Sequence, residues 1–65
     1  MWTTYWWICE DEDSELCGEE CFTELKDATY HDHVEYMCQL FPTDNFRCLG
    51  QVTREEADMM GLDTY

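Results

Sequence analysis

The charge balance is the feature that most constrains how this chain of 65 residues can fold. It has sixteen aspartate and glutamate residues but only three lysine and arginine residues, which gives a formal net charge of −13. Repulsion of that size opposes compaction, and a magnitude of roughly 2 to 8 is enough to keep a small domain in solution. The excess therefore indicates a selected property of the surface. It predicts that nucleic acids and anionic membranes repel the chain and that a basic surface attracts it.

The apolar content nevertheless predicts a folded domain. Hydrophobic residues make up 45% of the chain and aromatic residues 15%, which is unlike the composition of a disordered tail. A chain of this length buries only roughly 60% of its unfolded surface. We therefore expect one small domain over residues 1–65, without room for a deep catalytic cleft, and predict no catalytic residues and no enzyme activity.

Two elements are predicted in the first half of the chain. Residues 3–9 (TTYWWIC) are β-branched and aromatic and end at a run of acids, which predicts a strand. Residues 13–30 predict a helix, because Leu16, Cys17 and Cys21 begin an apolar stripe at three- and four-residue spacing. The carboxylates of this segment would then lie along the exposed side of the helix.

The second half predicts two strands and a helix. Residues 33–41 and 46–52 are read as strands around the turn-forming PTDN. In the register that keeps their apolar residues on one face, Cys38 faces Cys48, so these thiols should be neighbours, whether bridged or not. Residues 53–62 have a capping-box spacing and a glycine stop, which predict a helix. The expected fold is α+β: a small three-stranded antiparallel sheet with two helices covering one face, in the order strand, helix, strand, strand, helix.

The three tryptophans are divided between core and surface in this interpretation. Trp6 and Trp7 are adjacent in the predicted strand, so one of them should point into the core. The other could contact a partner, because aromatic anchors often dominate the energy of an interface.

The cysteines are interpreted mainly as small buried hydrophobic residues. The start of the chain lacks a signal-peptide pattern and no run approaches the length of a membrane helix, so we expect a cytoplasmic protein with reduced thiols. A zinc site is the alternative, but the closest pair, Cys17 and Cys21, is spaced for a helix and not for a zinc knuckle. No metal ligand is therefore predicted. The zinc alternative would draw four ligands from Cys9, Cys17, Cys21, His31, His33, Cys38 and Cys48.

The carboxylates are the candidate functional residues. Residues four apart on a helix rise about 6 Å, a scale comparable with the phosphates of a nucleic-acid strand, which rise about 3.4 Å per nucleotide. A groove lined with lysine and arginine to hold DNA could accept such a row instead. The predicted partner-binding residues are Glu10, Asp11, Glu12, Asp13, Glu15, Glu19, Glu20, Glu24 and Asp27.

In length, in charge and in segments such as EDEDSE and EECFTELKD, the chain resembles the small acidic DNA-mimic inhibitors of phages and mobile elements. That group includes anti-CRISPR, anti-restriction and uracil-glycosylase inhibitor proteins, and no residue-level motif defines it. The resemblance implies a stoichiometric inhibitor in the host cytoplasm that acts without catalysis and without a cofactor, and we expect an anti-CRISPR. Its partner would be a basic DNA-binding protein or a subunit of a CRISPR surveillance complex, with no direct binding to nucleic acid. Two alternatives stay open: a small zinc-stabilised protein-interaction domain and a salt-adapted housekeeping domain.

Overall fold

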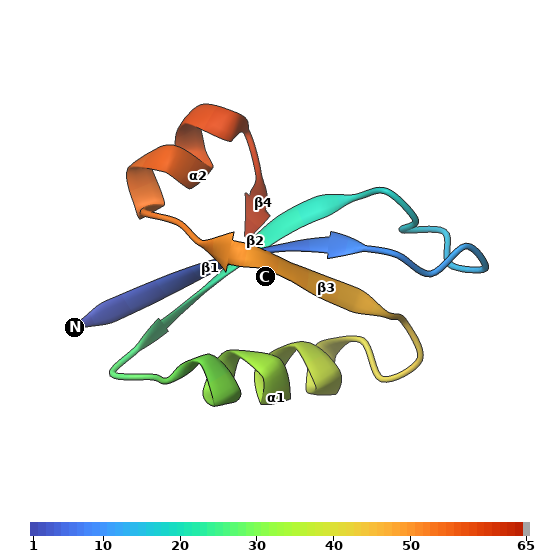
Figure 1. The fold of residues 1–65 in the computed structure, drawn as a ribbon, viewed down its shortest axis with the longest axis horizontal. Coiled ribbons are helices and arrows are strands. Elements are labelled where there is room, and N and C mark those ends of the chain that lie inside the picture. Colours follow the sequence, from blue (N-terminus) through green and yellow to red (C-terminus); the bar gives the residue numbers. More distant parts are fainter. Residues whose placement is uncertain (65) are drawn as a thin grey trace.

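The computed structural model of the chain describes residues 1–64, which form a mixed four-stranded sheet and two helices (Figure 1). The elements in chain order are β1 (Trp2–Cys9), β2 (Glu20–Lys26), α1 (Tyr30–Leu40), β3 (Phe46–Gln51), α2 (Arg54–Met60) and β4 (Asp63–Thr64). The strands lie in the order β3-β1-β2-β4. β1 is antiparallel to both β2 and β3, whereas the short β4 is parallel to β2.

The predicted three-stranded antiparallel sheet is therefore wrong, although the chain is α+β. The predicted order is wrong as well, since the second element is a strand and the third a helix. The two helices also do not share one face of the sheet. They lie on opposite sides of it, so that β1 and β2 are covered from both directions (Figure 1).

The central strands β1 and β2 carry apolar residues on both faces. Trp7 of β1 is paired with Cys21 of β2, and both pack against Met37 of α1. Because neighbouring strand residues point to opposite faces, Phe22 lies on the other side of the sheet. There the guanidinium of Arg54, from α2, lies 5.6 Å from the centre of the Phe22 ring. The core is thus two thin layers separated by one sheet.

The prediction that one of Trp6 and Trp7 lies in the core is confirmed. Trp7 is 3% exposed and Trp2 is 60% exposed, while Trp6 is half-buried. One of the two adjacent indoles, that of Trp7, therefore lies in the core. The exposed tryptophan is Trp2, at the start of β1.

The predicted helix over residues 13–30 is wrong. Residues 10–19 form a loop, and β2 follows it as far as Lys26. Cys21 is buried as expected, but Cys17 is exposed in the loop. The apolar residues that suggested a helix belong to two different elements: Leu16 and Cys17 lie in the loop, and Cys21 lies on one face of β2.

The predicted strand over residues 33–41 is also wrong, because this segment belongs to α1. Thr29 caps the helix: its hydroxyl accepts a hydrogen bond from the backbone of Asp32, whose carboxylate accepts one from the backbone of Thr29. Cys38 therefore lies on a helix and does not face Cys48 across a hairpin. Both are free thiols.

The strand predicted at residues 46–52 and the helix predicted at 53–62 are confirmed as β3 and α2. Thr53 caps α2 by accepting a hydrogen bond from the backbone of Glu56. Gly61 ends the helix in the left-handed conformation, with φ of 71°.

Candidate functional site

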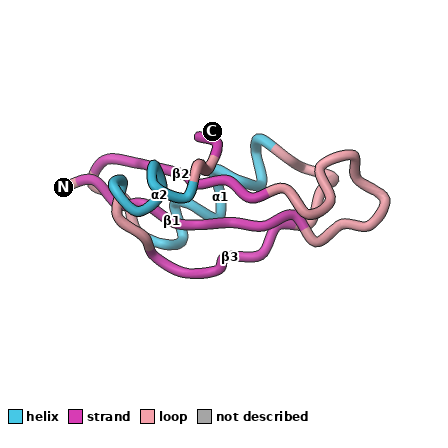
Figure 2. Tube along the Cα trace, turned by 90° about the horizontal axis from the view of Figure 1, so that it is seen from above, coloured by secondary structure: helices cyan, strands magenta, loops and turns pink. Residues whose placement is uncertain are grey.

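The candidate site is the acidic loop, defined here as residues 10–20, which joins β1 to β2. It contains seven carboxylates and no lysine or arginine, and all seven carboxylate residues except Asp11 are exposed. Figures 1 and 2 show the loop projecting beyond the sheet at one end of the molecule. The chain therefore carries its densest negative charge on a protrusion.

Local hydrogen bonds give the acidic loop a defined path. The backbone amide of Asp13 donates to the Asp11 carboxylate at 3.1 Å, and the amide of Ser14 donates to the carbonyl of Asp11 at 3.0 Å. At the base of the loop, the amide of Gly18 donates to the carbonyl of Cys9 at 3.0 Å. Gly18 has a φ of 84°, which a residue with a side chain rarely adopts. The carboxylates are thus presented on a turn-rich scaffold.

Both arginines and the N-terminal amine are paired with carboxylates outside segment 11–20. Arg47 contacts Glu10 at 3.2 Å, and Arg54 contacts Glu24 at 2.8 Å. The N-terminal amine is paired with Asp27. Among residues 1–64, no ion pair reaches the segment 11–20. Its negative field is therefore screened only by solvent and salt.

The structure separates the nine predicted partner-binding residues into two groups. Seven of them form the carboxylates of the acidic loop, with Glu20 as the first residue of β2. Glu24 and Asp27 lie toward the other end of β2, and four strand residues span about 13 Å. The Glu24 side chain is only 19% exposed and also accepts a hydrogen bond from Thr4 at 3.3 Å. Glu24 therefore has a structural role in joining the sheet to α2.

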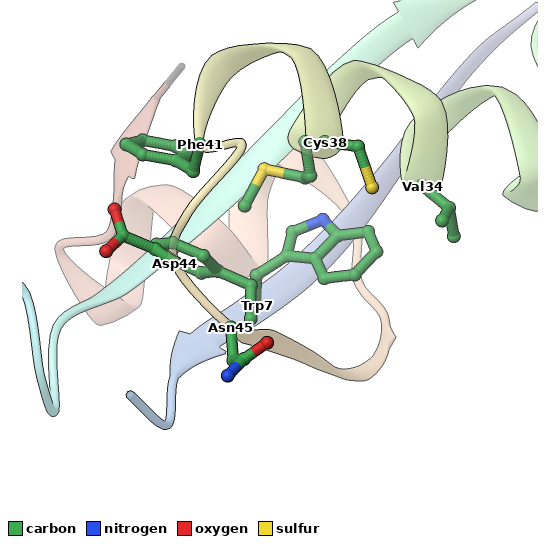
Figure 3. Close-up of a pocket in the computed structure, with 8 residues that line it drawn as sticks. Trp7, Val34, Cys38, Phe41, Asp44 and Asn45 are labelled. Atoms are coloured by element: carbon green, nitrogen blue, oxygen red, sulfur yellow. The ribbon is translucent and has the colours of Figure 1, made fainter. Parts of the chain in front are cut away.

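A small pocket, missed by sequence reasoning, lies between α1 and the connection to β3. Its volume is about 150 Å³. Figure 3 shows the indole of Trp7 in the middle of the pocket, with Val34 and Cys38 of α1 on one side and Asp44 in the connection. The sequence signal for it is a helical stripe of Tyr30, Val34, Cys38 and Phe41, whose first three residues also fit the period-two pattern of a strand. Its lining residues include Trp7, Val34, Cys38, Phe41, Asp44 and Phe46.

A buried polar network lies under α1. His33 is fully buried, with Nδ1 2.6 Å from the hydroxyl of Thr23 and Nε2 2.7 Å from the hydroxyl of Thr3. The indole of Trp7 donates to the same Thr23 oxygen at 3.0 Å. Burial lowers the pKa of His33, with the nearby Asp32 charge acting in the opposite direction. A neutral imidazole enclosed in this way fixes α1 to the sheet.

The thiols differ in accessibility. Burial, followed by the charges of Asp63 and Cys9, raises the pKa of Cys21 to about 12. Cys17 and Cys38 are exposed. Within the described part of the chain, residues 1–64, no group of three or more His, Cys, Asp or Glu side chains is placed to hold a metal ion.

No family model, curated protein or solved structure matches this chain. Of the helices in residues 1–64, none has the length and apolar character needed to cross a membrane.

Proposed function

We propose that this protein is a stoichiometric inhibitor whose acidic loop enters the nucleic-acid-binding groove of a basic protein. The observation that supports the proposal is the unpaired charge of segment 11–20, where six carboxylates project from one end of the fold without a cation among the described residues beside them. Such a protrusion costs the folded state some repulsion and contributes nothing to the core. Binding to a basic groove gives it a use.

The electrostatics of DNA explain why such a groove would accept the loop. Duplex DNA carries one negative charge per about 1.7 Å of its axis, so a DNA-binding groove presents closely spaced lysine and arginine side chains. A cluster of carboxylates on a narrow hairpin end can contact several of them together. Association should be fast and should weaken strongly as salt is raised.

The target class that we propose is a DNA-binding complex in the cytoplasm of a host cell, and a CRISPR surveillance complex is the first to test. The mode of action requires no catalysis, metal or cofactor. It requires only that the acidic loop and the target DNA compete for one surface.

The test is a competition assay in which a labelled DNA duplex is bound by its protein while the acidic chain is titrated in. Three proteins represent the three target types: a type I CRISPR surveillance complex, a restriction enzyme and a uracil-DNA glycosylase. Native protein should displace DNA from at least one of them, and its directly measured affinity for that target should fall steeply between about 50 and 200 mM salt. Displacement from none of the three would contradict the proposal.

The loop variant carries Glu12→Gln, Asp13→Asn and Glu15→Gln. Each exposed charge pair is worth up to about 1 kcal/mol, so the triple change should weaken competition about 10- to 100-fold. The matched control removes three carboxylates outside the loop and should retain nearly native potency. Equal losses for both variants would mean that net charge, and not the acidic loop, is responsible. The control carries Glu35→Gln, Glu55→Gln and Asp58→Asn.

A further inference from the structure

The pocket between α1 and β3 has the shape and chemistry of a receptor for one long cationic side chain. We propose that it receives an arginine of the basic partner while the acidic loop contacts that partner's groove. This inference rests on the proposed function for the identity of the partner. The occupant follows from the walls, the charge and the position of the pocket.

The walls of the pocket are apolar and largely aromatic. Trp7 lies at its centre, and the rings of Phe41 and Phe46 lie 4.7 Å apart beside it. Val34 of α1 completes the apolar surface. A volume of about 150 Å³ is the size of a cavity that holds one benzene ring. One side chain with an apolar stem fits this space.

The charge of the pocket selects a cation. Asp44 lines it and has no ion pair with any residue from 1 to 64. The neighbouring groove, which shares Trp7 and Phe46 with the pocket, contains Arg47, but Glu10 holds that guanidinium at 3.2 Å. A cation bound in the pocket therefore has one unpaired carboxylate, that of Asp44, among the lining residues, and the arginine of the adjoining groove is already paired with Glu10.

Arginine suits these walls better than the other candidates. Its guanidinium is planar, stacks on aromatic rings and is more weakly hydrated than the ammonium of lysine. A neutral apolar side chain would leave the Asp44 carboxylate without a partner. A second copy of this chain is disfavoured, because two molecules of net charge −13 repel each other.

The position of the pocket allows one partner to engage both surfaces. Trp7 belongs to β1, which runs directly into the acidic loop two residues after Trp7, at Cys9. Glu10, the first residue of the loop, lines the groove that adjoins the pocket. A basic groove that receives the loop thus brings its own arginines next to the pocket.

The test uses three probes with the same butyl stem: n-butylguanidinium for arginine, n-butylammonium for lysine and n-butylurea as a neutral planar analogue of the guanidinium. Each is titrated into the full chain while amide and indole NMR signals are followed. n-Butylguanidinium should shift the signals of Trp7 and of residues 41–46 in a saturable manner. It should bind more tightly than n-butylurea by about five-fold, the value of one exposed charge pair. Equal binding of the guanidinium and urea probes, tighter binding of n-butylammonium, or no saturable shift would each overturn the proposal.

Two variants and a control locate the effect. Asp44→Asn should remove the preference for n-butylguanidinium over n-butylurea, and Cys38→Phe should occlude the pocket and abolish binding of both. Glu55→Gln, which removes one charge on the far side of the sheet, should leave all three affinities unchanged. If Asp44→Asn keeps the preference, the carboxylate is not the selecting group and the inference is wrong. No target protein enters this titration, so its failure is distinct from failure of the acidic loop to compete with DNA.

Discussion

Replacing Thr23 by valine should destabilise the fold more than any other change of one hydroxyl to a methyl group in this chain. Thr23 is fully buried in β2, and its side-chain oxygen serves two groups. It accepts a hydrogen bond from the indole of Trp7 at 3.0 Å and lies 2.6 Å from Nδ1 of His33. Valine has the same shape but neither accepts nor donates, so both partners lose their bond.

The directions of the hydrogen bonds indicate why the hydroxyl is needed in both roles. If Thr23 accepts from Trp7 and donates to Nδ1 of His33, then Nε2 carries the proton and donates to the hydroxyl of Thr3 at 2.7 Å. Thr3 can then donate to the carbonyl of Ala28 at 3.2 Å. In this arrangement every polar atom of the network has a partner, and the imidazole is neutral.

The magnitude follows from the two groups left unsatisfied. A buried donor or acceptor without a partner costs about 1 to 3 kcal/mol, so the two together cost about 2 to 6 kcal/mol. The added methyl group regains about 0.8 kcal/mol at most. A net loss of about 3 kcal/mol is a large share of the roughly 3 to 10 kcal/mol available to a chain of this size. It corresponds to a fall in Tm of roughly 12 to 24 °C.

The assay is urea unfolding followed by tryptophan fluorescence and far-ultraviolet circular dichroism. Thr23→Ser keeps the hydroxyl and should recover most of the loss, which separates the hydrogen bonds from packing. Thr43→Val makes the same chemical change at an exposed site and should alter the free energy of unfolding by less than about 0.5 kcal/mol. If Thr23→Val is as stable as Thr43→Val, the buried network does not hold α1 to the sheet.

Two further predictions concern titration. Because burial lowers the pKa of His33, the unfolded chain takes up a proton before the folded chain does; the free energy of unfolding should be constant above about pH 6.5 and should fall as the pH drops below that value. His31→Gln should keep this dependence, since His31 is exposed, and a flat profile between pH 7.5 and 5.5 would contradict the role given to His33. With a pKa of about 12, Cys21 has roughly one thiolate in ten thousand at pH 8, so iodoacetamide should modify Cys17 and Cys38 first, as mass spectrometry of digested protein can check. Equal rates for Cys21 would mean that the sheet opens readily.

The elements that sequence reasoning placed correctly are those whose local signals agree with one another. Residues 3–9 are uniformly β-branched and aromatic, and β1 covers them. Thr53 and Gly61 mark the ends of α2 by the same capping chemistry that the structure contains. No tertiary contact has to override the local preference in these segments.

The two misassigned segments each fit both periodicities. In β2, Cys21 and Leu25 are four residues apart, which suits a helix face, but they also lie on one face of a strand. The segment forms a strand in which Phe22 and Thr23 are buried as well as Cys21. Consecutive buried residues suit a central strand, because both of its faces are covered.

In α1, the alternation of Val34, Tyr36 and Cys38 fits the period-two pattern of a strand, although the segment is a helix. The capping box of Thr29 and Asp32 was a start signal in the sequence that would have indicated a helix. With this segment predicted as a strand, the pocket could not be predicted, because Val34, Cys38 and Phe41 line one side of it only when the segment is helical.

The wrong prediction of a helix over residues 13–30 had a smaller effect on the charged site, and the reason is electrostatic. Carboxylates with no buried partner stay on the surface whether the backbone beside them is helical, extended or turning, so seven of the nine predicted residues remain together in the acidic loop. Glu24 and Asp27 lie apart from them and are paired with cations. Glu24 forms an ion pair with Arg54 of α2, and Asp27 forms one with the N-terminal amine. Arg54 and the N-terminal amine are therefore used where β2 meets α2 and the start of β1. Among residues 1–64, the ion pairs place only Arg47 against the loop, at Glu10, so the loop keeps most of its negative charge for the basic partner that we propose.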